Sequence, residues 1–189
     1  IITLKDEQPA IRAGAAQALA AIGKPAASAE MALKETLNDD NALVRVSAIM
    51  ALGQITGTPS VGPIIEALRD DDEQVKDVAS RLIVKVGQPA IKEISPLLTD
   101  TDTKIRIKVV NMLGSIGHIE ALASLQSALD AREREIRDAA IIALGQLGKA
   151  AIPALKEQLA DLNWNKRWSG VYSLRLIGGK EAAAAIVRA

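Results

Sequence analysis

The sequence predicts an all-α solenoid, built from pairs of antiparallel helices that are stacked side by side. Three observations indicate this fold: a basic residue that returns about every 31 residues, an apolar stripe after each such residue, and a second stripe before it. The basic residues lie 33, 31, 30, 31 and 30 residues apart: Arg12, Arg45, Lys76, Arg106, Arg137 and Arg167. We therefore number positions in each repeat from its basic residue as zero.

The stretch that follows each basic residue is expected to form the second helix of a repeat. Apolar residues recur at −1, +3, +7 and +10, and these steps of four, four and three place them on one helical face. Asparagine or aspartate at −4 can accept hydrogen bonds from the free amides of the first turn: Asn41, Asp72, Asp102 and Asn163. Glycine at +11 predicts the end of the helix: Gly23, Gly87, Gly117, Gly148 and Gly178.

The stretch that precedes each basic residue is expected to form the first helix. Position −8 is leucine in every repeat: Leu4, Leu37, Leu68, Leu98, Leu129 and Leu159. Both helices are expected to span roughly 11 to 15 residues, with short turns between them. Pro63 and Pro153 stand near the beginning of this helix, where proline is tolerated, whereas Pro96 should bend or shorten it.

An aspartate six residues before the arginine, and a Leu-Gly-x-Ile-Gly ending, carry a family resemblance. The motif is seen in Asp39 and Arg45, in Asp100 and Arg106, in Asp161 and Arg167, and in Leu113-Gly114-Ser115-Ile116-Gly117. The sequence resembles HEAT-repeat proteins, specifically the short HEAT-like subfamily of the phycobilisome-lyase type. The resemblance implies a right-handed superhelix of about six repeats, with the second helices lining its concave side. We expect one solenoid over residues 1–189, as a piece of a longer chain.

The same resemblance implies a structural ladder, in which aspartate and arginine bond between neighbouring repeats. Its members are Asp6, Arg12, Asp39, Arg45, Asp70, Lys76, Asp100, Arg106, Arg137, Asp161 and Arg167. In the fifth repeat Ala131 stands at −6, and Asp130 is one residue further back. Lys76 should make the weakest rung, because lysine lacks the planar fork of arginine. The alternative, that the basic column contacts phosphates, competes with this structural interpretation.

Positions +1, +5 and +8 of the second helix lie opposite its core face and are candidates for partner binding on the concave side. The candidate residues are Val46, Met50, Arg81, Ile107, Asn111, Asp138, Ile142, Trp168, Tyr172 and Arg175. Exposed apolar and aromatic side chains are typical of recognition surfaces. The alternative is that neighbouring second helices bury some of them, Val46 and Ile107 above all. Trp164 could likewise fill the gap left by Lys166, which replaces the usual apolar residue at −1.

The amino-acid composition limits the classes of function that this chain can have. With 23 basic and 23 acidic side chains the formal net charge is zero, which argues against nucleic acid. There is no Cys, no apolar run approaching the ~20 residues of a membrane span, and a single histidine, His118, in a turn. We therefore expect no catalytic residue, cofactor, metal or membrane, and a soluble cytoplasmic protein.

The leading hypothesis from sequence is a non-enzymatic scaffold that binds a partner protein or peptide on its concave surface. The first alternative is a lyase-type subunit acting on a bilin-carrying protein, because bilin lyase subunits share these repeats. A DNA-binding HEAT-like protein is the second alternative. Weak apolar content in the last helix also predicts end-to-end self-association of the fragment.

Overall fold

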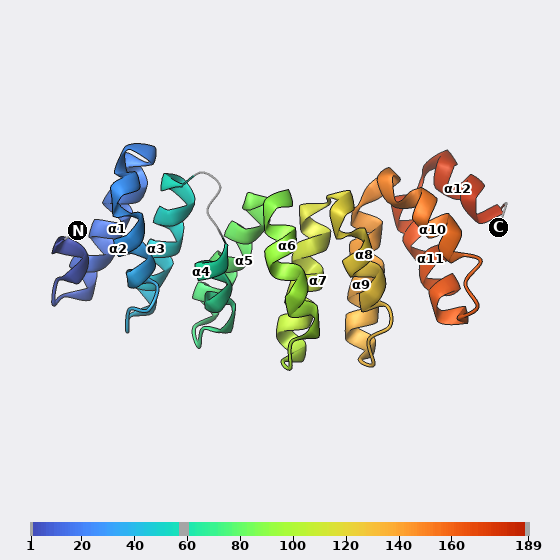
Figure 1. Ribbon diagram of the computed structural model, residues 1–189, viewed down its shortest axis with the longest axis horizontal. Coiled ribbons are helices and arrows are strands. Elements are labelled where there is room, and N and C mark those ends of the chain that lie inside the picture. Colours follow the sequence, from blue (N-terminus) through green and yellow to red (C-terminus); the bar gives the residue numbers. More distant parts are fainter. Residues whose placement is uncertain (1, 57–60, 188–189) are drawn as a thin grey trace. The chain divides into compact units, whose positions relative to one another are not determined.

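The computed structural model describes residues 2–56 and 61–187, and all regular structure within them is helical. The chain divides into two compact units, Ile1–Glu93 and Ile94–Ala189. Figure 1 shows the helices labelled in chain order. The all-α helical-repeat fold predicted from sequence is confirmed. That the two units form one continuous solenoid stays a prediction, and each is described by itself below.

In the N-terminal unit, three long helices form the second helices of their repeats: α1 (Pro9–Ile22), α3 (Ala42–Ile55) and α5 (Glu73–Val86). α1 packs against α3, and α3 against α5. The shorter segments complete the hairpins: η1 (Ile2–Lys5), η2 (Lys24–Ala29), α2 (Glu30–Thr36), α4 (Gly62–Ile65), η3 (Glu66–Arg69) and η4 (Gln88–Ala90). The short helix α6 (Ile91–Ile94) lies at the boundary of the two units.

The C-terminal unit repeats this plan. Its long helices are α7 (Thr103–Ile116), α9 (Arg134–Gln146) and α11 (Trp164–Ile177), and α9 packs against both of the others. The shorter segments are η5 (Ser95–Thr99), η6 (Ile119–Ala121), α8 (Leu122–Ala128), η7 (Gly148–Ala151), α10 (Ile152–Gln158) and α12 (Gly179–Val187).

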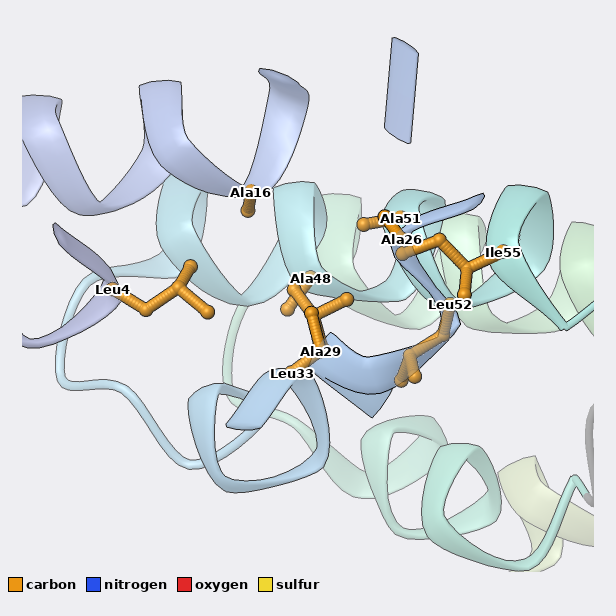
Figure 2. Packing of buried hydrophobic residues seen from close by; sticks show 9 residues of the cluster. All are labelled: Leu4, Ala16, Ala26, Ala29, Leu33, Ala48, Ala51, Leu52 and Ile55. Atoms are coloured by element: carbon orange, nitrogen blue, oxygen red, sulfur yellow. The ribbon is translucent and has the colours of Figure 1, made fainter. Parts of the chain in front are cut away.

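Small aliphatic side chains fill the core between the two helices of each repeat. Figure 2 shows one such cluster in the N-terminal unit, in which three leucines and one isoleucine lie among alanines. Its buried members are Leu4, Ala16, Ala26, Ala29, Leu33, Ala48, Ala51, Leu52 and Ile55. Burying apolar surface stabilises such a hairpin by about 25 cal/mol per Å². The alanines allow the helices to approach closely while leucine and isoleucine supply most of the buried area.

The predicted helix boundaries at −4 and +11 are confirmed. Asn41, Asp72, Asp102 and Asn163 each accept a hydrogen bond from a backbone N–H in the first turn of the following helix. All five glycines at +11 have positive φ, between 65° and 76°, which explains why glycine recurs there.

The first helices differ from the prediction of continuous helices of 11 to 15 residues. In α2, α8 and α10 the α-helical part is seven residues long, and a 3₁₀ segment precedes it. Pro96 has the predicted effect, because α6 ends at Ile94 and the chain continues as 3₁₀ helix over Ser95–Thr99. Proline lacks the N–H that an α-helix interior requires, which accounts for this shortening.

Glycine at +8 permits the close approach of consecutive second helices. A Cβ atom placed on Gly53 would lie 2.6 Å from Leu82 Cδ1 of α5, and one on Gly114 would lie 2.8 Å from the Cα atom of Ala143 in α9. Gly145 faces Leu176 of α11 in the same way. Positions +1 and +8, two turns apart, therefore share the side of the helix that meets the next one.

Within residues 2–56 and 61–187, no single helix is long and apolar enough to cross a membrane. One sharply bent pair, Arg134–Gln146 with Gly148–Gln158, meets the length and composition criteria when taken together.

Candidate functional site

Arginine and aspartate join consecutive repeats in the N-terminal unit. Arg12 donates from Nε and Nη2 to the two carboxylate oxygens of Asp39, at 2.7 Å each. Arg45 makes the same two-pronged contact with Asp70, at 2.7 and 2.6 Å. Such planar fork-to-fork bonding adds geometric specificity to the charge attraction. These side chains are largely buried, with no more than 14% of each exposed.

The remaining nitrogen of each arginine ties down the loop before its own helix. Nη1 donates to the backbone carbonyl of the residue at −6: from Arg12 to Asp6, from Arg45 to Asp39, from Arg106 to Asp100, from Arg137 to Ala131 and from Arg167 to Asp161. The aspartate at −6 in turn accepts the backbone N–H two residues later. One arginine thus fixes its own loop and holds the next repeat.

These contacts shift the pKa values of both partners. The hydrogen bond from Arg12 lowers the pKa of Asp39, although partial burial opposes it. Burial alone would raise the pKa of Asp70, but hydrogen bonds from Arg45 and from the Asp72 N–H outweigh it and the pKa is lowered. The same bonds raise the pKa values of Arg12 and Arg45. Ionised aspartate is therefore favoured in the folded state.

Three basic residues depart from the predicted pairing. Lys76 forms an ion pair of 2.7 Å with Glu73 of its own helix. Arg106 donates to Glu133, at 2.6 Å, because Ala131 replaces the aspartate of that repeat. Arg137 was expected to reach Asp161, yet no hydrogen bond or ion pair joins them within the described ranges.

The candidate partner-binding residues of the N-terminal unit differ in exposure. Val46 is buried, at 5% exposed, because it lies on the side of α3 that meets α5. Met50 is 56% exposed, and Arg81 is exposed as well. A shallow groove of about 250 Å³ runs between α3 and α5 and is lined by Met50, Gly53, Gln54, Val78, Arg81, Leu82 and Lys85. Partner binding by these residues stays a prediction.

In the C-terminal unit the candidates also divide by their place on the helix. Ile107 is half-buried on the side of α7 that carries Gly114, whereas Asn111 and Ile142 at +5 are exposed. Asp138 forms an ion pair of 3.3 Å with Arg134 of its own helix. Position +5 is thus the exposed column of the face that the sequence singled out.

All three aromatic residues of the chain lie on α11. The rings of Trp168 and Tyr172 stack, with centroids 5.2 Å apart and planes at 24°, and the guanidinium of Arg175 lies 4.9 Å from the centre of the Tyr172 ring. Trp164 is 64% exposed, so it does not fill the gap at Lys166. The Lys166 ammonium instead reaches Asp130, at 3.0 Å.

A second groove, of about 280 Å³, lies between α9 and α11. We call it the α9–α11 groove; its lining residues are Arg134, Arg137, Asp138, Ile141, Trp164, Asn165, Trp168 and Ser169. Arg134 was not predicted as a site residue, and Trp164 was expected to fill the gap at Lys166; both stand at −3, outside the columns of candidate residues. The shared position −3 in consecutive repeats is the signal that could have found them.

His118 caps the segment that follows it, with Nδ1 accepting the N–H of Glu120 at 3.3 Å. Over residues 2–56 and 61–187, no group of three or more His, Cys, Asp or Glu side chains could hold a metal ion.

Stacked two-helix repeats, glycine-ended second helices and arginine–aspartate rungs together define a HEAT-repeat protein. The chain belongs to the HEAT-repeat family, whose model matches residues 1–64 and 61–145, and the PBS lyase HEAT-like repeat matches residues 136–161.

Two relatives show which proteins the chain is similar to. It is 33% identical over 163 residues to phycocyanobilin lyase subunit alpha of Picosynechococcus, covering 77% of this chain and 60% of that protein. It is 28% identical over 159 residues to an uncharacterized phycocyanin operon protein Z of Pseudanabaena tenuis, covering 78% of each. The chain therefore spans less than two thirds of the length of the lyase subunit.

A solved structure shares the fold. The complex of CpcE and CpcF of phycocyanin lyase from Nostoc aligns with a TM-score of 0.51 and 24% identity, over 100% of this chain and 79% of that one. The prediction that this chain is not an enzyme is corrected by the lyase relative, since a subunit of an enzyme shares a third of the aligned residues. The repeat motif itself carries no chemistry, which is why sequence reasoning favoured a scaffold.

Proposed function

We propose that this chain is a lyase-type subunit that acts on a bilin-carrying protein. The observation that carries the proposal is the 33% identity over 163 residues with phycocyanobilin lyase subunit alpha. The similarity to a phycocyanin operon protein over most of both chains supports the same assignment. The chain spans 60% of the lyase subunit, so the activity is proposed for the protein that contains this chain.

A second protein is part of the proposal. The solved structure that shares this fold is a complex of two lyase subunits, and we propose that this chain also works with a partner subunit. The exposed +5 column supplies candidates for protein contacts, namely Met50 and Arg81 in the N-terminal unit, and Asn111 and Ile142 in the C-terminal unit. Exposed apolar side chains such as Met50 and Ile142 are typical of contact surfaces.

The side chains support a positioning role. The chain contains no Cys, so it cannot itself hold a bilin through a thioether. What it offers are flat aromatic surfaces and guanidinium groups on α9 and α11, which suit a conjugated ligand that carries carboxylates. Holding two reactants in the right geometry accelerates their reaction without any catalytic nucleophile.

The test is reconstitution of bilin transfer. The chain, a lyase partner subunit, apo-phycocyanin and phycocyanobilin are incubated, and bilin bound covalently to the acceptor is measured by fluorescence after denaturing electrophoresis. We expect attachment that requires the chain and exceeds the rate with the partner alone. Equal labelling of the acceptor with and without the chain would overturn the proposal.

A further inference from the structure

The guanidinium of the arginine at position zero forms hydrogen bonds along two different edges. In Arg12 and Arg45, Nη1 anchors the guanidinium to its own loop, while Nε and Nη2 bind the two oxygens of a carboxylate in the next repeat. In Arg106 a glutamate oxygen occupies Nη2. We call the edge that carries Nε and Nη2 the carboxylate-binding edge. It binds an acidic side chain wherever the following repeat supplies one.

Arg137 makes the Nη1 contacts to its own loop, but no acidic side chain of the described residues binds its carboxylate-binding edge. Its Nη1 donates to the carbonyl oxygens of Ala131 and Arg132, at 2.8 and 2.7 Å, so its guanidinium is held as in the other repeats. No acceptor for its Nε or Nη2 is found among residues 2–56 and 61–187. The carboxylate of Asp161 accepts the N–H of Asn163 in its own loop, at 2.8 Å. Arg137 is therefore oriented for a carboxylate that this part of the chain does not provide.

The surroundings of Arg137 indicate what kind of carboxylate fits. Arg137 lines the α9–α11 groove together with the rings of Trp164 and Trp168, which are 64% and 50% exposed. Arg134 adds a second positive charge, opposed by Asp138. A half-buried guanidinium next to broad apolar rings suits an acid attached to a flat conjugated group.

We propose that the carboxylate-binding edge of Arg137, flanked by Trp164 and Trp168, binds one propionate of a bilin. This inference rests on the proposed function and deepens it, because it assigns a carboxylate subsite to a named side chain. A bilin is an open-chain tetrapyrrole that carries two propionates. A groove of about 280 Å³ has room for one propionate-bearing ring, and the rest of the chromophore extends along the exposed rings of α11.

Exposed aromatic rings favour a bilin over an acidic segment of a partner protein. An aspartate or glutamate on a partner needs only the guanidinium, as in the rungs at Asp39 and Asp70, and those rungs have no tryptophan beside them. Trp164 and Trp168 are large apolar surfaces left partly in water, and covering them with a conjugated ring gains free energy.

The test compares free phycocyanobilin with its dimethyl ester, in which both propionates are blocked. Binding to the whole chain is followed by bilin absorbance and by quenching of tryptophan fluorescence, since both tryptophans lie on α11. We expect the wild-type protein to bind the ester about tenfold or more weakly, as loss of a charge-assisted hydrogen bond implies. Arg137→Gln should bind the acid and the ester equally.

Two further variants separate the carboxylate contact from general effects. Arg132→Gln removes an exposed positive charge close in sequence while leaving the carbonyl that Arg137 uses, and it should still discriminate acid from ester. Trp168→Leu should weaken acid and ester alike. Far-UV circular dichroism establishes that each variant is folded.

The results distinguish the site from the function. If the wild-type protein binds the bilin but ignores both esterification and the loss of Arg137, the site is overturned while the proposed function stands. If it binds no bilin at all, the site is overturned, and the reconstitution of bilin transfer with the partner subunit decides the proposed function separately. Competition by a polyglutamate peptide that depends on Arg137, without an effect of Arg137 on bilin binding, would assign the edge to a protein acid and overturn the proposal.

Discussion

Arg106 and Glu133 form an ion pair of 2.6 Å across consecutive repeats, in the place that an arginine–aspartate pair occupies in the N-terminal unit. Arg106 also donates to the Asp100 carbonyl and to Thr103 Oγ1. This guanidinium is mostly buried, with 16% of its side chain exposed. It therefore holds its own loop and the next repeat together.

Arg106→Ala should destabilise the C-terminal unit by about 1–3 kcal/mol, because it leaves the carbonyl and Glu133 without their donor. Urea unfolding followed by tryptophan fluorescence measures this, since Trp164 and Trp168 both lie in that unit. The matched control is Arg167→Ala, in which an exposed guanidinium donates, among residues 2–56 and 61–187, only to carbonyls of its own loop. A loss in the control as large as that in Arg106→Ala would contradict the inter-repeat role.

Gly114→Ala should be destabilising and Gly14→Ala stabilising, although both glycines lie within second helices. A methyl group at Gly114 would come within 2.8 Å of the Ala143 Cα atom, so the α7–α9 packing would have to open. Gly14 has open space around it, and alanine there gains about 1 kcal/mol of helix propensity. Thermal unfolding followed by circular dichroism should show shifts of opposite sign. Equal shifts would mean that close approach at +8 does not limit the packing.

Much of the fold was predictable because most second helices carry their own boundary signals. Asn41, Asp72 and Asp102 begin helices, and the glycines at +11 end them, through hydrogen bonds and backbone angles that depend only on local sequence. The first helices were predicted less well. Their broken 3₁₀ and α segments depend on packing against neighbours as much as on proline position.

The candidate site was predictable only in part, because exposure depends on the next helix. Val46 belongs to the candidate face by its helical angle, yet the side it shares with Gly53 is the one that approaches α5. The pairing of Arg106 with Glu133 was not predicted from sequence. In the N-terminal unit an aspartate at −6 accepts from the arginine of the preceding repeat, whereas here the longer side chain of Glu133 at −4 does so. The lining of the α9–α11 groove includes two residues at −3 in different repeats, Arg134 and Trp164, which no single-repeat pattern brings together.

The N-terminal unit should lose stability in acid. The folded-state pKa values of Asp39 and Asp70 are lowered, whereas unfolded aspartate titrates near 3.9. A lowered folded-state pKa contributes stability that is present above the unfolded pKa and is lost as the pH falls through the folded one. We therefore expect the hydrogen-exchange protection factors of α1 and α3 amides, which are corrected for the intrinsic pH dependence of exchange, to be constant above about pH 5 and to fall below about pH 4.

Asp39→Asn tests the source of this pH dependence. The variant keeps an oxygen for the Asn41 N–H but has no carboxylate to titrate against Arg12. It should be less stable at neutral pH and should show a shallower loss between pH 4 and pH 2. An unchanged slope would assign the acid sensitivity to other groups.

Lys166→Ile should stabilise the C-terminal unit, because Lys166 occupies a position that is apolar and buried in the four repeats before it. Val44, Val75, Ile105 and Ile136 at this position are all buried, whereas 29% of the Lys166 side chain is exposed and its ammonium lies 3.0 Å from Asp130.

A partly exposed ion pair contributes about 0–1 kcal/mol, while burial of an isoleucine side chain contributes about 1.5–3 kcal/mol, so a net gain of about 1 kcal/mol is expected. Room for the new side chain exists in an open groove of about 380 Å³ between α8, α10 and the beginning of α11, which Lys166 lines together with Leu129, Ala154 and polar side chains. The gain should appear as a higher urea midpoint of tryptophan fluorescence, and Asp130→Asn alone should change that midpoint little. A lower midpoint in Lys166→Ile would mean that the lysine and its aspartate, and not the missing apolar contact, hold α11 in place.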